Sequence, residues 1–117
     1  MNTVCHVEFD STDLERSQRF FEGLFGWKFR AFTDKMVVFG TDEGHVGGLE
    51  KVDAVRPGTT PSVWFRVPDI EAYVAKASGL GGSVLREKTE LPHVGWSAQL
   101  ADPDGNPVGL VQFSEDA

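Results

Sequence analysis

An internal repeat constrains the fold of this chain more than any other feature of its sequence. Adding 56 to a residue number in the first half leads, at seven positions, to a residue of the same kind in the second half. The pairs are Val7 with Val63, Phe9 with Phe65, Asp13 with Asp69, Leu14 with Ile70, Leu24 with Leu80, Gly26 with Gly82, and Phe29 with Leu85. A repeat of this length is typical of one supersecondary unit that occurs twice.

The first copy has the pattern of one strand, one helix and three further strands. Residues 3–9 alternate between apolar and polar, which predicts a half-buried strand. We expect Ser11 or Thr12 to cap the following helix and Gly26 to end it. The expected apolar stripe of this helix is Leu14, Ser17, Phe21, Leu24 and Phe25. Short alternating segments then predict strands at 27–32, 35–39 and 45–52.

The second copy repeats this order. A strand is expected at 62–67, followed by a helix and a glycine-rich break at 79–82. Near the ends of the copies the offset rises from 56 to 61, since Gly48 pairs with Gly109. The second copy therefore holds five extra residues, which we place in a loop at 89–95.

The two copies are too small to stand as separate domains, because each buries too little apolar surface by itself. We predict a single domain with one module at about 1–52, a linker at 53–61 and a second module at about 62–117. We expect each helix to cover the sheet face that carries Val7, Phe9, Leu49, Val63, Phe65 and Leu110. The opposite faces carry His6, Glu8, Gly48, Ser62, Trp64, Arg66 and Gly109. This mixture of polar groups, aromatic rings and glycines predicts a shared cavity for a small molecule.

Charge and composition argue against several classes of partner. The 117 residues include 11 basic and 18 acidic side chains, and the formal net charge of −7 disfavours nucleic acid and anionic membranes. The apolar runs are too short to span a membrane, and we expect no secretory signal. Cys5 is the single cysteine and permits no intrachain disulfide. We therefore expect a cytoplasmic location.

Several segments together resemble the vicinal oxygen chelate superfamily, which includes glyoxalase I, bleomycin-resistance proteins, fosfomycin-resistance enzymes and extradiol dioxygenases. The segments are His6–Phe9, Asp13–Trp27, Gly47–Leu49, Val63–Asp69 and Asp102–Leu110. The resemblance covers nearly the whole chain. It implies an α+β fold in which two paired βαβββ modules form an eight-stranded, U-shaped cup, often around one divalent metal. It also implies a homodimer, since members often pair or exchange modules.

The resemblance further implies a metal site with one ligand on each of four strands. The matching positions are His6, Gly48, Ser62 and Gly109. Only His6 has a side chain suited to Zn, Ni, Fe or Mn, so we expect no cofactor or a weakly bound divalent metal. A substitute set of His6, Glu8 and Glu50 is an alternative, because the two carboxylates share strand faces with the expected positions.

His6 and Glu8 are also candidates for acid–base catalysis, since a histidine and a carboxylate facing an apolar cup suit proton transfer. The alternative is a structural pair in which Glu8 fixes the tautomer of His6. The residues expected to contact a ligand are Trp64, Arg66, His93 and Trp96. Core packing is the alternative for the two tryptophans. We expect His45 to lie exposed in a turn.

Three functions stay open at this point. The first is a glyoxalase-related enzyme of the lyase or isomerase type, which binds an oxygenated metabolite, uses His6 and Glu8, and holds a metal weakly or not at all. The second is a metal-free protein of the bleomycin-resistance kind, which sequesters an aromatic or cationic molecule. The third is a regulatory module with a vestigial cavity. Fold resemblance supports the class but does not choose among these functions.

Overall fold

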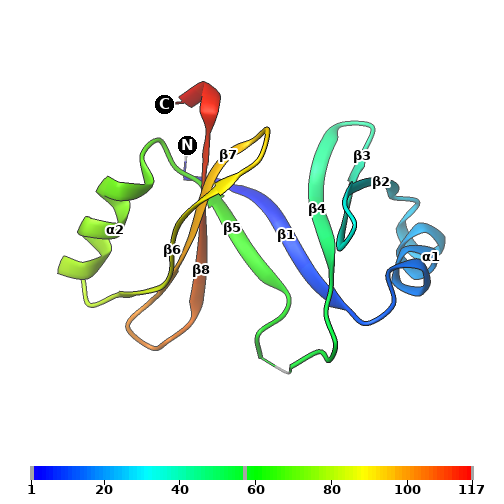
Figure 1. Ribbon diagram of the computed structural model, residues 1–117, viewed down its shortest axis with the longest axis horizontal. Helices are drawn as coiled ribbons and strands as arrows, with labels where there is room; N and C mark the ends of the chain where they lie inside the picture. The colour runs from blue at the N-terminus through cyan, green and yellow to red at the C-terminus, as the bar shows by residue number, and fades with distance from the viewer. Residues whose placement is uncertain (1, 57, 117) are drawn as a thin grey trace. The chain divides into compact units, whose positions relative to one another are not determined.

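The structure, a computed structural model, describes residues 2–56 and 58–116. It contains the predicted β-α-β-β-β order twice (Figure 1). The first copy consists of β1 (Val4–Ser11), α1 (Leu14–Phe25), β2 (Lys28–Thr33), β3 (Met36–Thr41) and β4 (Gly44–Lys51). The second consists of β5 (Ser62–Arg66), α2 (Ile70–Gly79), β6 (Ser83–Leu91), β7 (Gly95–Ala101) and β8 (Pro107–Phe113), with a 3₁₀ turn at Ser114–Asp116. The predicted α+β fold class is confirmed.

The eight strands form one mixed sheet in the order β2-β3-β4-β1-β5-β8-β7-β6. In each copy the first strand runs parallel to the last, whereas the other neighbours are antiparallel. By its contacts the chain divides into two compact units. One holds His6–Ser62, and the other holds the residues up to Cys5 together with those from Val63 onward.

Strand β1 contributes to both units. The backbone of Thr3 accepts a hydrogen bond from the backbone N–H of Arg66 at 2.9 Å, which joins the start of the chain to β5. Further along β1, Val7 to Ser11 pair in parallel with β4. The break at Ser62 agrees with the end of the predicted linker at 53–61. The units differ from the predicted modules because the residues up to Cys5 belong with the second module. That both units form a single domain stays a prediction.

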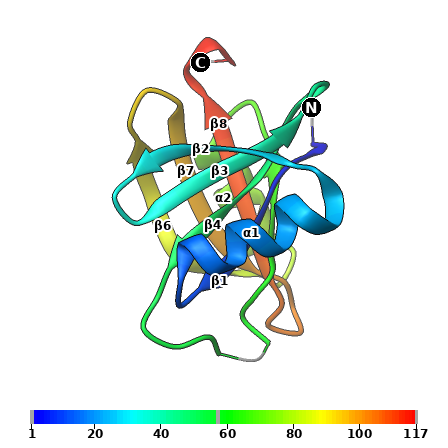
Figure 2. The same cartoon turned by 90° about the vertical axis from the view of Figure 1, so that its right-hand side faces the viewer.

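In the unit of His6–Ser62, α1 lies against one face of the sheet (Figure 2). Aromatic side chains form the core between them. The ring of Phe21 on α1 lies 5.2 Å from that of Phe9 and 5.4 Å from that of Trp27, centroid to centroid. Trp27 stacks on Phe39 at 4.4 Å, and Leu49 is fully buried beside them. The alternation of β1 and β4 therefore turns Phe9 and Leu49 toward the helix, as predicted.

Two details of α1 differ from the prediction. Asp13, and neither Ser11 nor Thr12, caps the helix, because its carboxylate accepts a hydrogen bond from the backbone N–H of Arg16 at 3.1 Å. The Ser11 hydroxyl instead accepts from the backbone N–H of Asp13 at 3.1 Å. Leu24 and Phe25, both expected in the apolar stripe, are 58% and 56% exposed. The helix ends as predicted at Gly26, whose φ of 69° favours glycine.

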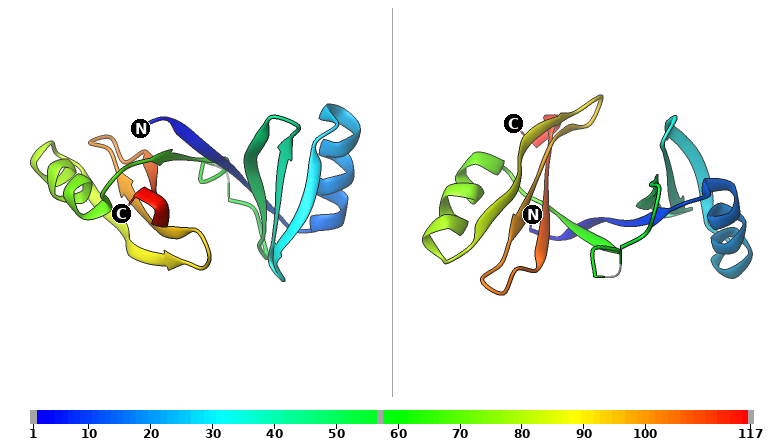
Figure 3. Two further views of the ribbon diagram at one scale, coloured as in Figure 1. Left: turned by 90° about the horizontal axis from the view of Figure 1, so that it is seen from above. Right: turned by 60° about the horizontal axis from the view of Figure 1, so that its bottom comes forward.

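The other unit packs α2 on one side of β6, β7 and β8 (Figure 3). Its core consists of Val67, Ile70, Ala98, Leu100 and Leu110. Asp69 caps α2, and the side-chain oxygen of Gln112 accepts a hydrogen bond from the backbone N–H of Ile70 at 2.9 Å. Val63, which we expected to face the helix, is 36% exposed. In the described ranges, neither helix is long and apolar enough to cross a membrane.

The five extra residues of the second copy lie in a longer hairpin, which corrects the predicted loop at 89–95. β6 has nine residues and β7 has seven, whereas β2 and β3 have six each. Thr89 pairs with Ser97 and Leu91 with Gly95, so the first part of the predicted loop is strand. The turn itself contains only the three residues between Leu91 and Gly95.

Candidate functional site

The sheet face opposite α1 carries the chemically active side chains of the His6–Ser62 unit. Because side chains alternate along a strand, His6, Glu8 and Asp10 of β1 share this face, while Val7 and Phe9 face the helix. The parallel pairing of β1 with β4 sets Glu8 beside Gly48 and Asp10 beside Glu50. The candidate site is thus built from the middle of two neighbouring strands.

Glu8, His6 and His45 form a hydrogen-bonded row on this face. Nε2 of His6 lies 3.0 Å from Oε1 of Glu8, and Nδ1 of His6 lies 2.8 Å from Nε2 of His45. The side chains of His6 and Glu8 are 17% and 14% exposed. The two imidazoles stack with centroids 5.1 Å apart and an interplanar angle of 11°. The structure therefore brings together the two residues that the sequence proposed for acid–base catalysis.

The bonds of this row assign its tautomers. Since a carboxylate accepts and does not donate, a neutral His6 in this arrangement carries its proton on Nε2 and offers the lone pair of Nδ1 as an acceptor. His45 then donates from its own Nε2 to that lone pair. The arrangement of Glu8 and His6 resembles a carboxylate–imidazole pair, in which the carboxylate orients the ring and stabilises its protonated form.

His45, which the sequence predicted only as an exposed turn residue, is a further functional candidate. It is exposed as expected, but it lies in β4 rather than in a turn, and it reaches His6 through a β-bulge between Phe39 and Gly40. Although the residue as a whole is exposed, partial burial of its ring lowers the pKa of His45, and the nearby His6 and Arg30 lower it further. Its separation of 39 residues from His6 left no local signal in the sequence.

Three carboxylates gather next to this row. Oxygen atoms of Glu8, Asp10 and Glu50 all lie within 4.8 Å of one another. Burial raises the pKa of Asp10, and the neighbouring charge of Glu8 adds to the effect. The structure groups Glu8 and Glu50 of the expected substitute set with Asp10 rather than with His6, and metal binding by these residues stays a prediction. The sequence contained a signal for Asp10, because it is two residues beyond Glu8 and therefore lies on the same face of β1.

The four ligand positions implied by the family resemblance do not suit a metal. A Cβ atom built on Gly48 would lie 3.3 Å from Cε1 of His6, so the ring fills that space. A Cβ atom on Gly109 would lie 2.3 Å from Cδ2 of Trp64, so the indole excludes any side chain there. Ser62 offers only a weak neutral hydroxyl. The residues present therefore do not fit the usual four-ligand centre.

In the unit that contains β5 to β8, the sheet face opposite α2 carries an aromatic and cationic group of side chains. Trp64 lies over its strand neighbour Gly109. The guanidinium of Arg86 lies 5.7 Å from the centroid of the Trp64 ring and donates to Oγ of Ser97 at 2.9 Å. Ser97 is buried, so Arg86 is held from two sides. Sequence reasoning proposed Trp64 but missed Arg86.

Arg66, the cation proposed from the sequence, has partners near the end of the chain. Its guanidinium lies 4.7 Å from the centroid of the Phe113 ring. It also donates to a carboxylate oxygen of Glu115 at 3.0 Å. A role for Arg66 in ligand binding stays a prediction.

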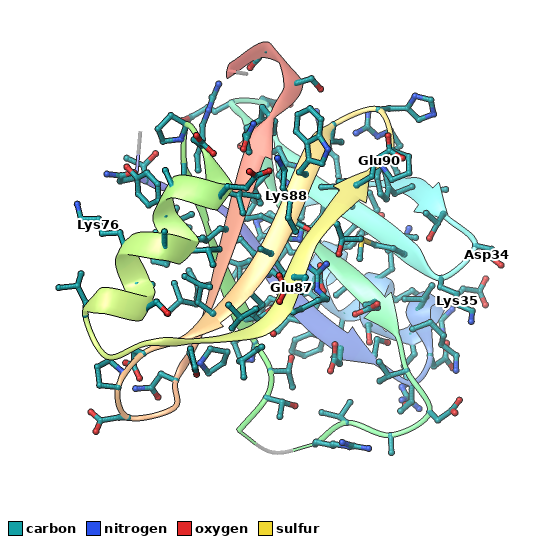
Figure 4. The ribbon with its side chains drawn as sticks, turned by 60° about the vertical axis from the view of Figure 1, so that its left-hand side comes forward. Asp34, Lys35, Lys76, Glu87, Lys88 and Glu90 are labelled. Atoms are coloured by element: carbon teal, nitrogen blue, oxygen red, sulfur yellow. The ribbon has the colours of Figure 1, made fainter. Side chains whose placement is uncertain are left out.

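Trp96 lies on the other face of this sheet from Trp64. The pairing of β7 with β8 turns Ala98 and Leu110 toward α2, and Trp96, two residues from Ala98, packs against the same core. The ammonium of Lys88 lies 5.0 Å from the Trp96 ring and donates to Glu71 of α2 at 3.1 Å, on the helix side of β6 (Figure 4). The core-packing alternative thus describes Trp96 better than a place beside Trp64.

His93 lies exposed in the turn between β6 and β7, with a left-handed φ of 67°. The structure places it at the tip of this hairpin, in a separate part of its unit from the buried core. A contact between His93 and a ligand stays a prediction.

Comparisons with known proteins agree with the fold. The model of the Glyoxalase/Bleomycin resistance protein/Dioxygenase superfamily matches residues 3–110. A glyoxylase-like domain-containing protein from Didymella fabae is 30% identical over 116 residues, which covers 88% of each chain.

Solved structures show the same fold at low identity. A hypothetical protein from Bacillus halodurans superposes with a TM-score of 0.79 at 16% identity, over 99% of this chain and 97% of the other. A Mn(II)-bound glyoxalase from Novosphingobium aromaticivorans gives a TM-score of 0.69 at 20% identity, over 95% of this chain and 38% of the other.

Proposed function

Since this chain belongs to the Glyoxalase/Bleomycin resistance protein/Dioxygenase superfamily, we propose that it is an enzyme of the lyase or isomerase type. It binds an oxygenated small molecule and moves a proton on it, with His6 and Glu8 as the acid–base pair. The observation that carries this proposal is the hydrogen-bonded row of Glu8, His6 and His45.

The row supports the proposal through the direction of its bonds. Glu8 keeps the His6 proton on Nε2, so the proton that His6 gains on Nδ1 comes from Nε2–H of His45, which takes a proton from the ligand at its own Nδ1 in exchange. The carboxylate then stabilises the imidazolium that forms, as in other carboxylate–histidine pairs. His45 is hydrogen-bonded to Nδ1 of His6 and is itself exposed, so it connects His6 to the ligand or to solvent. Acid–base groups placed in this way contribute about 10²–10⁴-fold to a rate.

The proposed step uses only side chains of this chain. A related solved structure is a Mn(II)-bound glyoxalase, but here the four expected ligand positions hold one histidine, two glycines and a serine. Carboxylates such as Glu8 and Glu50 suit hard divalent cations such as Mg²⁺ or Mn²⁺. We therefore propose at most weak binding of such a cation. We further propose that the chain acts as a cytoplasmic homodimer.

The test is enzyme-catalysed exchange of a substrate C–H proton with deuterium from solvent. A panel of 2-hydroxy ketones, 2-hydroxy acids and hemithioacetals of 2-oxo aldehydes with glutathione is incubated with the protein in D₂O and followed by ¹H NMR. We expect exchange with at least one class, and a loss of about 100-fold in rate for His6→Gln and Glu8→Gln. Arg19→Gln, an exposed change on α1, serves as the control. Unchanged exchange in His6→Gln would remove the basis of the proposal.

A second candidate is a metal-free binding protein that sequesters an aromatic ligand. The observation in its favour is the indole of Trp64 at the place of the eighth-strand ligand, with Arg86 against its ring. This candidate predicts that an aromatic compound raises the melting temperature of wild-type protein and of His6→Gln equally, with no proton exchange. The enzyme proposal predicts exchange that depends on His6.

A further inference from the structure

A small basic cavity adjoins His45 on the same sheet face. It has a volume of about 240 Å³ and is lined by residues of β2, β3 and β4, among them Lys28, Arg30, Thr41 and His45. Drug-sized ligands occupy cavities of about 300–1,000 Å³, so this one suits a single small group of a larger molecule. We propose that it binds the anionic group, a carboxylate or a phosphate, of the molecule on which His6 acts.

The uncompensated charge in this cavity belongs to Arg30. Lys28 and Arg30 are two residues apart on β2, so their side chains point to the same face of the sheet. Lys28 forms an ion pair with Asp42, which balances much of its charge. Within the part of the chain that the structure describes, the Arg30 side chain makes no hydrogen bond or ion pair. Although the chain as a whole has a net charge of −7, the positive charge of this guanidinium attracts an anion at this place.

Gly40, which lines this cavity, lies against the backbone of the neighbouring strand. A Cβ atom on Gly40 would lie 2.4 Å from the carbonyl oxygen of Gly44, so no side chain can stand there. The bulge between Phe39 and Gly40 shifts the β3–β4 register at this point and pairs Gly40 with His45. The same irregularity therefore lies in the wall of the cavity and places His45 on the face of His6.

Charge along this face also orients a ligand. Arg30 and Lys28 lie on the β2 side of His45, whereas Glu8, Asp10 and Glu50 lie on β1 and β4. An anionic group is attracted by the first set and repelled by the second, so only one end of the molecule enters the cavity. With that end bound at Arg30, the rest of the molecule lies against His45 and, through it, His6. This inference rests on the proposed function and names its substrate class as an anionic one.

The test measures anion binding directly. Inorganic phosphate and malonate are titrated separately into ¹⁵N-labelled protein at constant ionic strength, and amide shifts are recorded. We expect saturable shifts at Arg30, Thr41 and His45 with at least one anion, and the tighter of the two identifies the preferred group. Arg30→Gln should weaken binding at least tenfold and Arg30→Lys less. Lys35→Gln, the same charge change at the β2–β3 turn (Figure 4), should weaken it less than twofold.

The outcomes separate this inference from the proposed function. Absence of saturable shifts with both anions, or equal losses in Arg30→Gln and Lys35→Gln, would overturn the anion site. A ¹⁵N spectrum of each variant that matches the wild-type pattern confirms that it folds. His6→Gln should lose proton exchange but keep anion binding. If His6→Gln keeps exchange while Arg30→Gln loses anion binding, the anion site stands and the proposed role of His6 fails.

Discussion

Replacement of Gly109 by alanine tests the placement of Trp64, which decides what stands at the eighth-strand ligand position. The added Cβ would lie 2.3 Å from Cδ2, 2.4 Å from Cε3 and 2.8 Å from Cγ of the indole. Because Cγ itself is too close, rotation of the ring about its own axis does not relieve the overlap. Trp64 must therefore leave its position beside Arg86.

The expected cost follows from two opposing effects. Overpacking of this kind costs about 1–3 kcal/mol, while alanine in a strand interior gains about 0.5–1 kcal/mol over glycine. The net loss of unfolding free energy is then about 1–2 kcal/mol. With an unfolding entropy of about 2.1 cal/mol/K per residue, a chain of 117 residues loses about 4 °C in melting temperature per kcal/mol. We expect a drop of about 4–8 °C.

Calorimetry and chemical denaturation measure this effect, with two controls. Gly23→Ala, on α1 with no atom within 4 Å of the new Cβ, should be neutral or stabilising by up to about 1 kcal/mol. In a Trp64→Ala background, Gly109→Ala should no longer cost stability, because the clashing ring is absent. A Gly109→Ala protein as stable as the wild type, or an equal cost of Gly109→Ala in both backgrounds, would refute the placement of the indole.

Three further predictions concern charge and capping. Asp10→Asn should raise the unfolding free energy at pH 7, because burial raises the pKa of Asp10 and makes its charged form unfavourable in the fold. The gain should vanish below the unfolded pKa of 3.8, and chemical denaturation at pH 7 and below pH 3.8 measures both effects. The lowered pKa of His45 means that the unfolded chain binds its proton first, so stability should fall as pH drops below 6.5 and fall less in His45→Gln, as thermal melts between pH 7.5 and 5 test. Asp13→Ala and Asp69→Ala should each cost about 1 kcal/mol in denaturant melts, whereas Glu22→Ala should not.

Local periodicity predicted most of the fold. The repeat and the alternation of short segments gave both β-α-β-β-β copies, because strand and helix periods are properties of neighbouring residues. The same alternation placed His6 and Glu8 on one face of β1, so their contact at 3.0 Å required no long-range information. The helix end at Gly26 is equally local.

Other features were decided by strand register, which the sequence does not display. The length of the β6–β7 hairpin and its pairing with β8 turned Trp96 toward α2, although the sequence left its face open. The choice of Asp13 over Ser11 as helix cap depended on where β1 stopped pairing with β4, at Ser11 itself.

The sequence by itself determined the repeated order of elements and the placement of His6 and Glu8 on one face of one strand. Only the tertiary structure joined His45 to His6 across 39 residues, set Trp64 over Gly109 and opened the cavity beside Arg30. These contacts depend on a bulge and on the register between strands that are distant in the chain. Such pairing is fixed by the packing of the whole sheet and has no period that a single sequence reveals.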